Sequence, residues 1–371
     1  MRDAKPLPLS TGCLPALRRR IREGVRELLP AYFAMPMATG VISIAAHFLD
    51  LPLLAHALFW LNLVLYAALW LMTFARVRFY LQDLLADWSD HQRGVGFFTT
   101  VAATNILGSQ FAIVRGDQAV GFGLWWVGLV LWSLCMYGIF TTLTVKENKP
   151  SLAEGINGGW LTAVVATQSL CVLGCAISPA FGAHRAPALF IMLILWLCGG
   201  MLYIWLISLI FYRYSFFRFP ASDLNPPYWI NMGAMAISTL AGTALIRNAE
   251  ASELLRSLRP FLQGFTLWYW ATATWWIPML FILAVWRHGL KRFPVAYDPL
   301  FWGAVFPLGM YASSTFQLAR VVELPFLIPL ARGFLVVALA AWTLTFLGLL
   351  RCLMPWESPS DAGRLHKGDF S

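Results

Sequence analysis

The sequence is poor in charged residues. Only 12% of its 371 residues are Asp, Glu, Lys or Arg, whereas 59% are hydrophobic. Soluble domains carry about 25% charged residues. The chain also contains 18 Trp and 27 Phe, more apolar surface than an ordinary soluble core can absorb. The composition therefore excludes a typical soluble domain and indicates a polytopic membrane protein.

The sequence also lacks the residue patterns of catalytic and metal sites. Its six cysteines fall mostly inside apolar runs, and Cys171 and Cys175 have no His or carboxylate nearby. This spacing matches neither a zinc site nor a redox motif, so we interpret both as small packing residues. No catalytic dyad or nucleophile motif is present. We therefore expect no enzyme activity, no cofactor and no metal, with a membrane-embedded enzyme as the weakest alternative.

The apolar runs predict an all-α membrane protein with ten transmembrane helices. The first run has no small-residue cleavage site behind it and should stay as a span. We divide the chain into a basic N-terminal tail (1–30), a transmembrane domain (31–353) and a short C-terminal tail (354–371). The predicted spans are 31–49, 54–75, 94–114, 119–142, 157–178, 187–211, 228–247, 261–286, 300–319 and 328–353.

The positive charges predict the orientation of these spans. With an even number of spans, both termini lie on one side of the membrane. If that side is the cytoplasm, 20 of the 27 Lys and Arg residues are cytoplasmic, as the positive-inside rule requires. The net charge of +9 thus reflects topology and attraction to membrane lipids, and it gives no support for a nucleic-acid partner. We expect a bacterial inner (plasma) membrane protein with both termini cytoplasmic.

The odd-numbered spans share a motif that the even-numbered spans lack. Each odd span carries a small residue followed by threonine, and the threonines are 65, 63, 72 and 76 residues apart. This near-regular period predicts a helical hairpin used five times. The motif pairs are Ala38-Thr39, Ala103-Thr104, Ala166-Thr167, Ser238-Thr239 and Ser314-Thr315.

The repeat favours small, hydroxyl-bearing odd helices around a central pore, with bulky even helices outside. Residues four apart on a helix share one face, so a polar stripe can follow each inner helix. The alternative is that the small residues only mark tight helix contacts. The predicted pore-lining residues are Thr39, Ser43, Thr100, Thr104, Gly108, Thr167, Thr239, Thr243 and Ser314.

Proline interrupts two of these inner spans. Pro36 lies in the first and Pro307 in the ninth, where Gly309 follows closely. A proline removes a helical hydrogen bond, so we predict kinks at Pro36, Pro307 and Gly309. A bend accommodated by neighbouring helices is the alternative. Phe306 directly precedes Pro307, and an apolar ring on the pore axis could close a narrow pore.

Four stretches resemble a known family of membrane proteins. These are YFAMPMATGVISIAA, FFTTVAATNILGSQ, INGGWLTAVVATQSL and FWGAVFPLGMY, of which residues 156–170 are the most specific. They resemble the tellurite-resistance/C4-dicarboxylate transporter family, also called the voltage-dependent anion channel family, which includes plant slow anion channels. The resemblance implies five hairpins around a pore, a homotrimer with one pore per subunit, and a phenylalanine gate at Phe306.

The predicted function is a transmembrane anion channel or facilitator for small anions or C4-dicarboxylates. No Asp, Glu, Lys or Arg lies near the centre of a span, which argues against tight proton coupling, although His47 could titrate near the outer mouth. The alternative is a proton-coupled carrier for C4-dicarboxylate, sulfite or a tellurium oxyanion. Arg115, Arg320 and Arg332 could attract anions to the outer mouth or simply anchor the helices at lipid headgroups.

Overall fold

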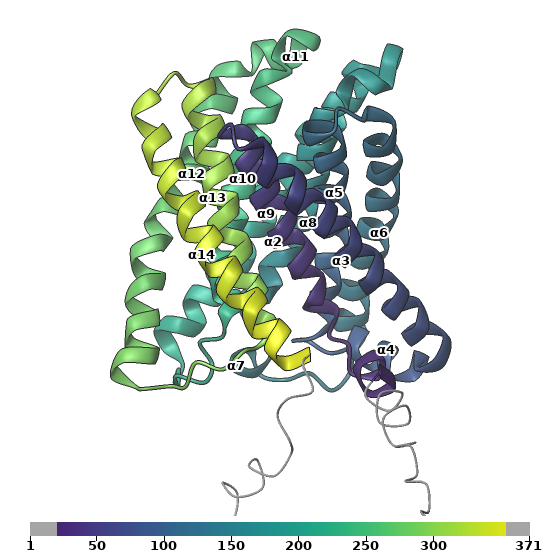
Figure 1. The fold of residues 1–371 in the computed structure, drawn as a ribbon, viewed down its shortest axis with the longest axis vertical. Helices are drawn as coiled ribbons and strands as arrows, with labels where there is room; N and C mark the ends of the chain where they lie inside the picture. The colour runs from purple at the N-terminus through teal and green to yellow at the C-terminus, as the bar shows by residue number, and fades with distance from the viewer. Residues whose placement is uncertain (1–20, 354–371) are drawn as a thin grey trace, which may run out of the picture.

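The computed structural model describes residues 21–353, and within this range the regular structure is entirely helical. The C-terminal tail and most of the N-terminal tail expected from the sequence lie outside the described residues. Figure 1 shows long helices running roughly along one direction, with residues 21 and 353 at the same end of the molecule. We call this end the terminal face. It also carries the short helices α4 (Leu81–Trp88) and α7 (Leu152–Gly155).

Each predicted span overlaps one long helix, and several helices extend beyond the predicted ends. These helices are α2 (Ala34–Phe48), α3 (Pro52–Phe79), α5 (Phe98–Val114), α6 (Gln118–Val145), α8 (Thr162–Ala176), α9 (Arg185–Phe216), α10 (Ile230–Arg247), α12 (Arg259–Val285), α13 (Trp302–Val321) and α14 (Ile328–Leu353).

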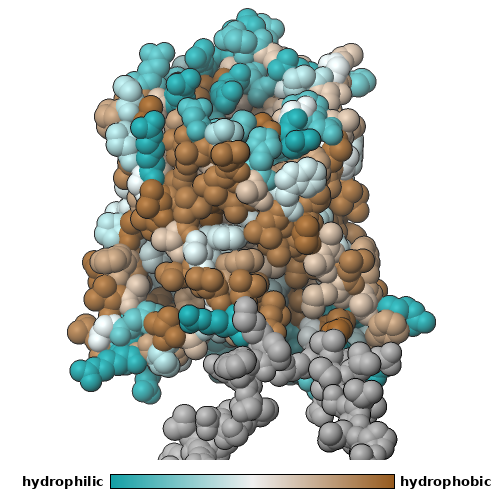
Figure 2. Space-filling model, in the orientation of Figure 1, coloured by the Kyte–Doolittle hydropathy of each residue, from teal (hydrophilic) through white to brown (hydrophobic). Residues whose placement is uncertain are grey.

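The prediction of an all-helical, polytopic membrane protein is confirmed. Among the described residues, nine helical segments are long and apolar enough to cross a membrane. On the face that Figure 2 shows, apolar residues form a band across the middle of the molecule and polar residues gather at both ends. Helix α13 is not among the nine, since its sequence includes Ser313, Ser314, Gln317 and Arg320.

Five helices form a closed inner ring. Helix α2 contacts α5, α5 contacts α8, α8 contacts α10, α10 contacts α13, and α13 returns to α2. The other five long helices lie on the outside of this ring, each packed against the inner helix that precedes it in the chain. In Gly94–Val114, which includes α5, 89% of the most apolar 18 residues are buried, against 22% in Pro52–Phe79. The small residues of the inner helices thus meet protein on all sides, whereas the bulky outer helices face lipid.

Every inner helix begins with a 3-10 turn at the terminal face. These turns are η1 (Pro30–Phe33), η2 (Gly94–Phe97), η3 (Gly158–Leu161), η5 (Pro226–Trp229) and η8 (Pro299–Phe301). Proline suits the first position of a helix, because its fixed φ is already helical and its missing N–H has no helical partner there. The turns contact one another in the same cyclic order as the helices that follow them.

Candidate functional site

The starts of the five inner helices surround one cavity at the terminal face. Its volume is about 150 Å³, and every inner helix or the turn before it contributes to its wall. One wall residue from each inner helix or its start is Ala34, Thr99, Thr162, Ile230 and Gly303. The cavity therefore lies inside the ring and forms its mouth at this end.

The rim of the cavity is held by contacts between neighbouring helix starts. Thr99 Oγ1 donates a hydrogen bond to the carbonyl of Pro30 at 3.0 Å, and Thr162 Oγ1 donates one to the carbonyl of Val95 at 2.8 Å. A Cβ atom on Gly158 would lie 2.4 Å from the carbonyl oxygen of Pro227. Only a glycine at position 158 lets η3 lie this close to η5, because a Cβ atom would clash with the backbone of Pro227.

The polar side chains on the cavity wall are one arginine, several amides and two threonine hydroxyls. Arg93 and Asn157 line the cavity together with Asn225, and no carboxylate does. Asn157 Oδ1 accepts a hydrogen bond from the amide of Gly159 at 2.7 Å, which directs the side-chain NH2 group away from that turn. The N-terminal ends of helices carry a partial positive charge, so five of them around one cavity favour an anion.

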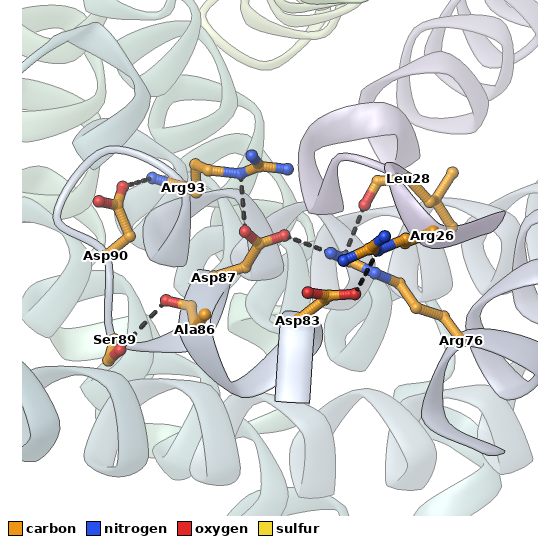
Figure 3. A network of polar contacts seen from close by, with 9 residues as sticks. All are labelled: Arg26, Leu28, Arg76, Asp83, Ala86, Asp87, Ser89, Asp90 and Arg93. Atoms are coloured by element: carbon orange, nitrogen blue, oxygen red, sulfur yellow. Dashed lines mark hydrogen bonds and ion pairs between the residues drawn. The ribbon is translucent and has the colours of Figure 1, made fainter. Parts of the chain in front are cut away.

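The guanidinium of Arg93 is positioned by a network that Figure 3 shows in detail. Arg93 Nε lies 2.8 Å from Asp87 Oδ1, and Arg76 donates from Nη2 to the other carboxylate oxygen at 2.7 Å. Arg76 also donates to the carbonyl of Leu28 at 2.6 Å. Arg76 and Asp87 are buried, with side chains 4% and 8% exposed, whereas the side chain of Arg93 is 42% exposed.

Histidine contributes no charge to this mouth at neutral pH. Burial lowers the pKa of His91, which directly precedes the cavity-lining Gln92 in the chain, and the positive charge of Lys146 lowers it further. The ordinary pKa of histidine is near 6.5, so the imidazole of His91 is neutral at pH 7. The cation at the mouth is therefore Arg93.

Phe306 lies about one helical turn beyond the cavity. It is 1% exposed and follows the cavity-lining Gly303 by three residues, a rise of about 4.5 Å along α13. Helix α13 continues through Pro307 without interruption. The Pro307 ring packs against Gly233 of α10, and a Cβ atom on Gly309 would lie 2.8 Å from Ile42 of α2. Pro307 and Gly309 thus bring α13 close to both of its neighbours in the ring.

The other predicted kink residue lies near the start of its helix. Pro36 is in the first turn of α2, directly after η1. Its position therefore coincides with the change from a 3-10 to an α-helical turn. Kinks at Pro36, Pro307 and Gly309 stay predictions.

The repeated threonines make hydrogen bonds to the outer helices. Thr39 Oγ1 accepts from the Trp342 indole at 3.0 Å, and Thr167 Oγ1 accepts from the Trp132 indole at 2.8 Å. The Thr104 hydroxyl pairs with the Tyr66 hydroxyl at 2.8 Å, and Thr315 accepts from Trp270 at 3.0 Å. In the fourth repeat the indole of Trp196 donates to the carbonyl of Ser238 instead. These hydroxyls face the outer layer, and a pore-lining role for Thr39, Thr104 and Thr167 stays a prediction.

The remaining predicted pore-lining residues are all buried, and their hydroxyls bond to backbone. Ser43 donates to the carbonyl of Ala55 on α3 at 2.7 Å. Gly108 packs against Leu173 of α8. Four others donate to carbonyls of the preceding turn of their own helix, namely Thr100, Thr239, Thr243 and Ser314. Their role in a pathway also stays a prediction.

The basic residues expected near the outer mouth lie on the protein surface. Arg115, Arg320 and Arg332 are exposed, and the Arg115 guanidinium stacks 5.7 Å from the ring centre of Trp60. This contact fits an interfacial anchor. Within residues 21–353, no group of three His, Cys, Asp or Glu side chains could hold a metal ion.

The cavity itself was not predicted from the sequence. Its signal is the cluster of Pro, Gly and Asn residues before each inner span, as in NGGW (157–160) and NPPYW (225–229). Such clusters read as ordinary turns. Only the closed ring shows that these turns, which are about 65 residues apart in the chain, meet at one place.

Comparison with known proteins gives one family across most of the chain. The profile of the voltage-dependent anion channel family matches residues 27–350. An uncharacterized membrane protein of Mycobacterium tuberculosis is 36% identical over 152 residues, which cover 41% of this chain and 77% of that protein. An uncharacterized transporter of Methanocaldococcus jannaschii is 24% identical, covering 80% of this chain and 86% of that protein. The sulfite efflux pump SSU1 of Arthroderma benhamiae is 23% identical, covering 85% of this chain and 88% of the pump.

Proposed function

This chain belongs to the voltage-dependent anion channel family, and from that premise we propose that it conducts small anions through the ring formed by α2, α5, α8, α10 and α13. The family and its named transporters support anion transport by an integral membrane protein. The observation that carries the proposal is the cavity of about 150 Å³ inside the ring, which five helix starts surround and whose wall contains Arg93 but no carboxylate.

The proposal includes ten membrane crossings in five hairpins. Helix α13 has 20 residues, enough to cross the hydrocarbon core, and lies inside the ring where its polar residues avoid lipid. Residues 21 and 353 lie at the same end of the molecule, as an even number of crossings requires. The positive-inside rule makes the terminal face cytoplasmic. A bacterial inner membrane and a homotrimer with one pathway per subunit complete the proposal.

Phe306 is proposed as the gate of this pathway. Five residues lie three positions further along the inner helices than the wall residues Ala34, Thr99, Thr162, Ile230 and Gly303. They are Met37, Ala102, Val165, Gly233 and Phe306. Phe306 has the largest side chain of the five, so one ring can close the passage at this depth. A bulky apolar constriction blocks ions both sterically and by excluding water.

The gate is tested by anion flux in proteoliposomes at a set voltage without a pH gradient. We expect Phe306→Ala to raise chloride, nitrate or malate flux well above wild type, because the constriction is removed. Phe316→Ala is the matched control, since Phe316 lies on the same helix but stacks against Phe48, with 6.1 Å between ring centres. Equal flux in wild type and both variants would contradict the gate.

A coupled carrier is the second candidate, favoured by the similarity to a sulfite efflux pump. In this reading the same ring carries sulfite, a C4-dicarboxylate or a tellurium oxyanion together with protons. The assay separates the two candidates: transport that occurs only under an imposed proton gradient supports the carrier, and transport driven by voltage alone supports the channel.

A further inference from the structure

The cavity at the terminal face contains two side-chain amides that the fold leaves without a full set of partners. Asn157 is only 9% exposed, and its Oδ1 is used by the amide of Gly159. Its NH2 group makes no hydrogen bond within the described part of the chain. Asn225 lines the same cavity, and its buried Oδ1 has no partner among residues 21–353. The NH2 group of Asn157 can therefore donate a hydrogen bond to a molecule in the cavity that its side chain lines.

Arg93 adds a charged donor to the same wall. Its Nε is used by Asp87, and its two terminal nitrogens make no hydrogen bond to the described residues. Figure 3 shows that Asp87 meets the guanidinium at Nε. Asp87 pairs with Arg76 as well as with Arg93, so its single negative charge does not fully neutralise Arg93. Asp90, the next carboxylate along the chain, accepts the backbone amides of Gln92 and Arg93 through Oδ1.

We propose that this cavity is a binding site for one small oxyanion, held by the terminal nitrogens of Arg93 and the side-chain amide of Asn157. This site rests on the proposed anion pathway, and it is the first site that an anion occupies when it enters at the terminal face. The N-terminal ends of the inner helices favour the same negative charge.

The chemistry of the site favours a small oxyanion. Planar guanidinium groups match the paired oxygens of carboxylate-like and oxyanion ligands, and hydrogen bonds to charged groups are about twice as strong as neutral ones. A cavity of about 150 Å³ is the size that accepts a molecule such as benzene, so a compact anion fits and a large organic acid does not. The cavity lies inside the ring, away from the lipid-facing outer helices. The expected ligand is therefore a free anion and not a lipid headgroup.

The decisive variant is Asn157→Asp. Aspartate keeps the oxygen that accepts the hydrogen bond from Gly159, and it serves as a helix N-cap as well as asparagine does. It replaces the NH2 donor of a cavity-lining side chain with a negative charge. The local fold should persist while anion binding is lost. Asn148→Asp is the matched control, because Asn148 is an exposed loop residue outside the cavity wall and the substitution adds the same charge.

The experiment measures nitrate-dependent thermal stabilisation of the full chain in detergent, with gluconate keeping the ionic strength constant. We expect saturable stabilisation of wild type and of Asn148→Asp. Asn157→Asp should raise the half-saturating nitrate concentration roughly tenfold or more, with an unchanged melting temperature in gluconate alone. Arg93→Gln should weaken nitrate binding to a similar extent, and Arg93→Lys should restore part of it because the charge remains.

Nitrate flux in proteoliposomes separates this inference from the proposed function. If wild type conducts nitrate but all four variants bind it as wild type does, the site is overturned and the pathway stands. If the variants lose binding as expected but wild type conducts no anion, the site stands and the proposed function fails. Loss of binding in Asn148→Asp as well as in Asn157→Asp would reduce the effect to general surface charge and would overturn the site.

Discussion

Within residues 21–353, replacing Asp87 by asparagine removes the only carboxylate that pairs with the buried Arg76. Arg76 lies near the end of α3 with its side chain 4% exposed, and Asp87 lies on α4 with its side chain 8% exposed. The two are joined at 2.7 Å, and the remaining hydrogen bond of Arg76 goes to the carbonyl of Leu28. In Asp87→Asn the arginine keeps its charge in a buried place without a counter-charge.

The expected loss of stability is large for a single substitution. Removing one partner of a buried ion pair costs about 3–5 kcal/mol, since the desolvated charge that remains is uncompensated. The second partner, Arg93, is 42% exposed and can turn to solvent, so it adds little to this cost. We therefore expect Asp87→Asn to lower the free energy of unfolding by about 3 kcal/mol or more.

Equilibrium unfolding in mixed micelles of detergent and SDS measures this change. Asp83→Asn is the control on the same helix, because Asp83 pairs with Arg26 at the surface, where the two side chains are 39% and 62% exposed. Exposed pairs contribute little, so this variant should unfold like wild type. Adding Arg76→Met to Asp87→Asn should recover part of the loss by removing the unpaired charge. Equal stability of Asp87→Asn and Asp83→Asn would refute the reasoning.

Two further predictions concern the packing of the ring. Trp132→Phe removes the indole donor to Thr167 and should lower the free energy of unfolding by about 0.5–1.5 kcal/mol; no change would mean that this hydrogen bond does not hold the two layers together. Gly158→Ala places a methyl group 2.4 Å from the carbonyl oxygen of Pro227 and should cost about 1–3 kcal/mol through a backbone shift. Gly264→Ala, with open space around it on α12, is the control and should be neutral or slightly stabilising; equal effects of the two substitutions would contradict the close approach.

The sequence predicted the helices well, but it did not determine the hydrogen-bond partners of their polar side chains. Apolar runs locate membrane helices because each helix satisfies its own backbone hydrogen bonds, which makes the signal local. Each predicted span therefore overlaps one observed helix. The threonines recur at a near-regular spacing in the sequence. This spacing does not determine which neighbouring residue each hydroxyl contacts. In the structure Thr39 and Thr167 accept hydrogen bonds from outer-helix tryptophans.

The family resemblance drawn from four short stretches is confirmed by the match over residues 27–350. The anion-binding cavity could not be predicted in the same way. Asn157 and Arg93 lie in different connections of the chain and belong to no common motif. They meet because small residues let the five inner helices close into a ring, a consequence of contacts among all five helices.

The sequence alone thus determined the class of protein, the positions of the helices and the family. These follow from composition, from local hydrophobicity and from motifs within single segments. The tertiary structure alone decided that Thr39 and Thr167 pair with outer-helix tryptophans, that Asp87 joins Arg76 to Arg93, and that five helix starts enclose one cavity. Each of these depends on which segments become neighbours in space, and packing of the whole ring sets that.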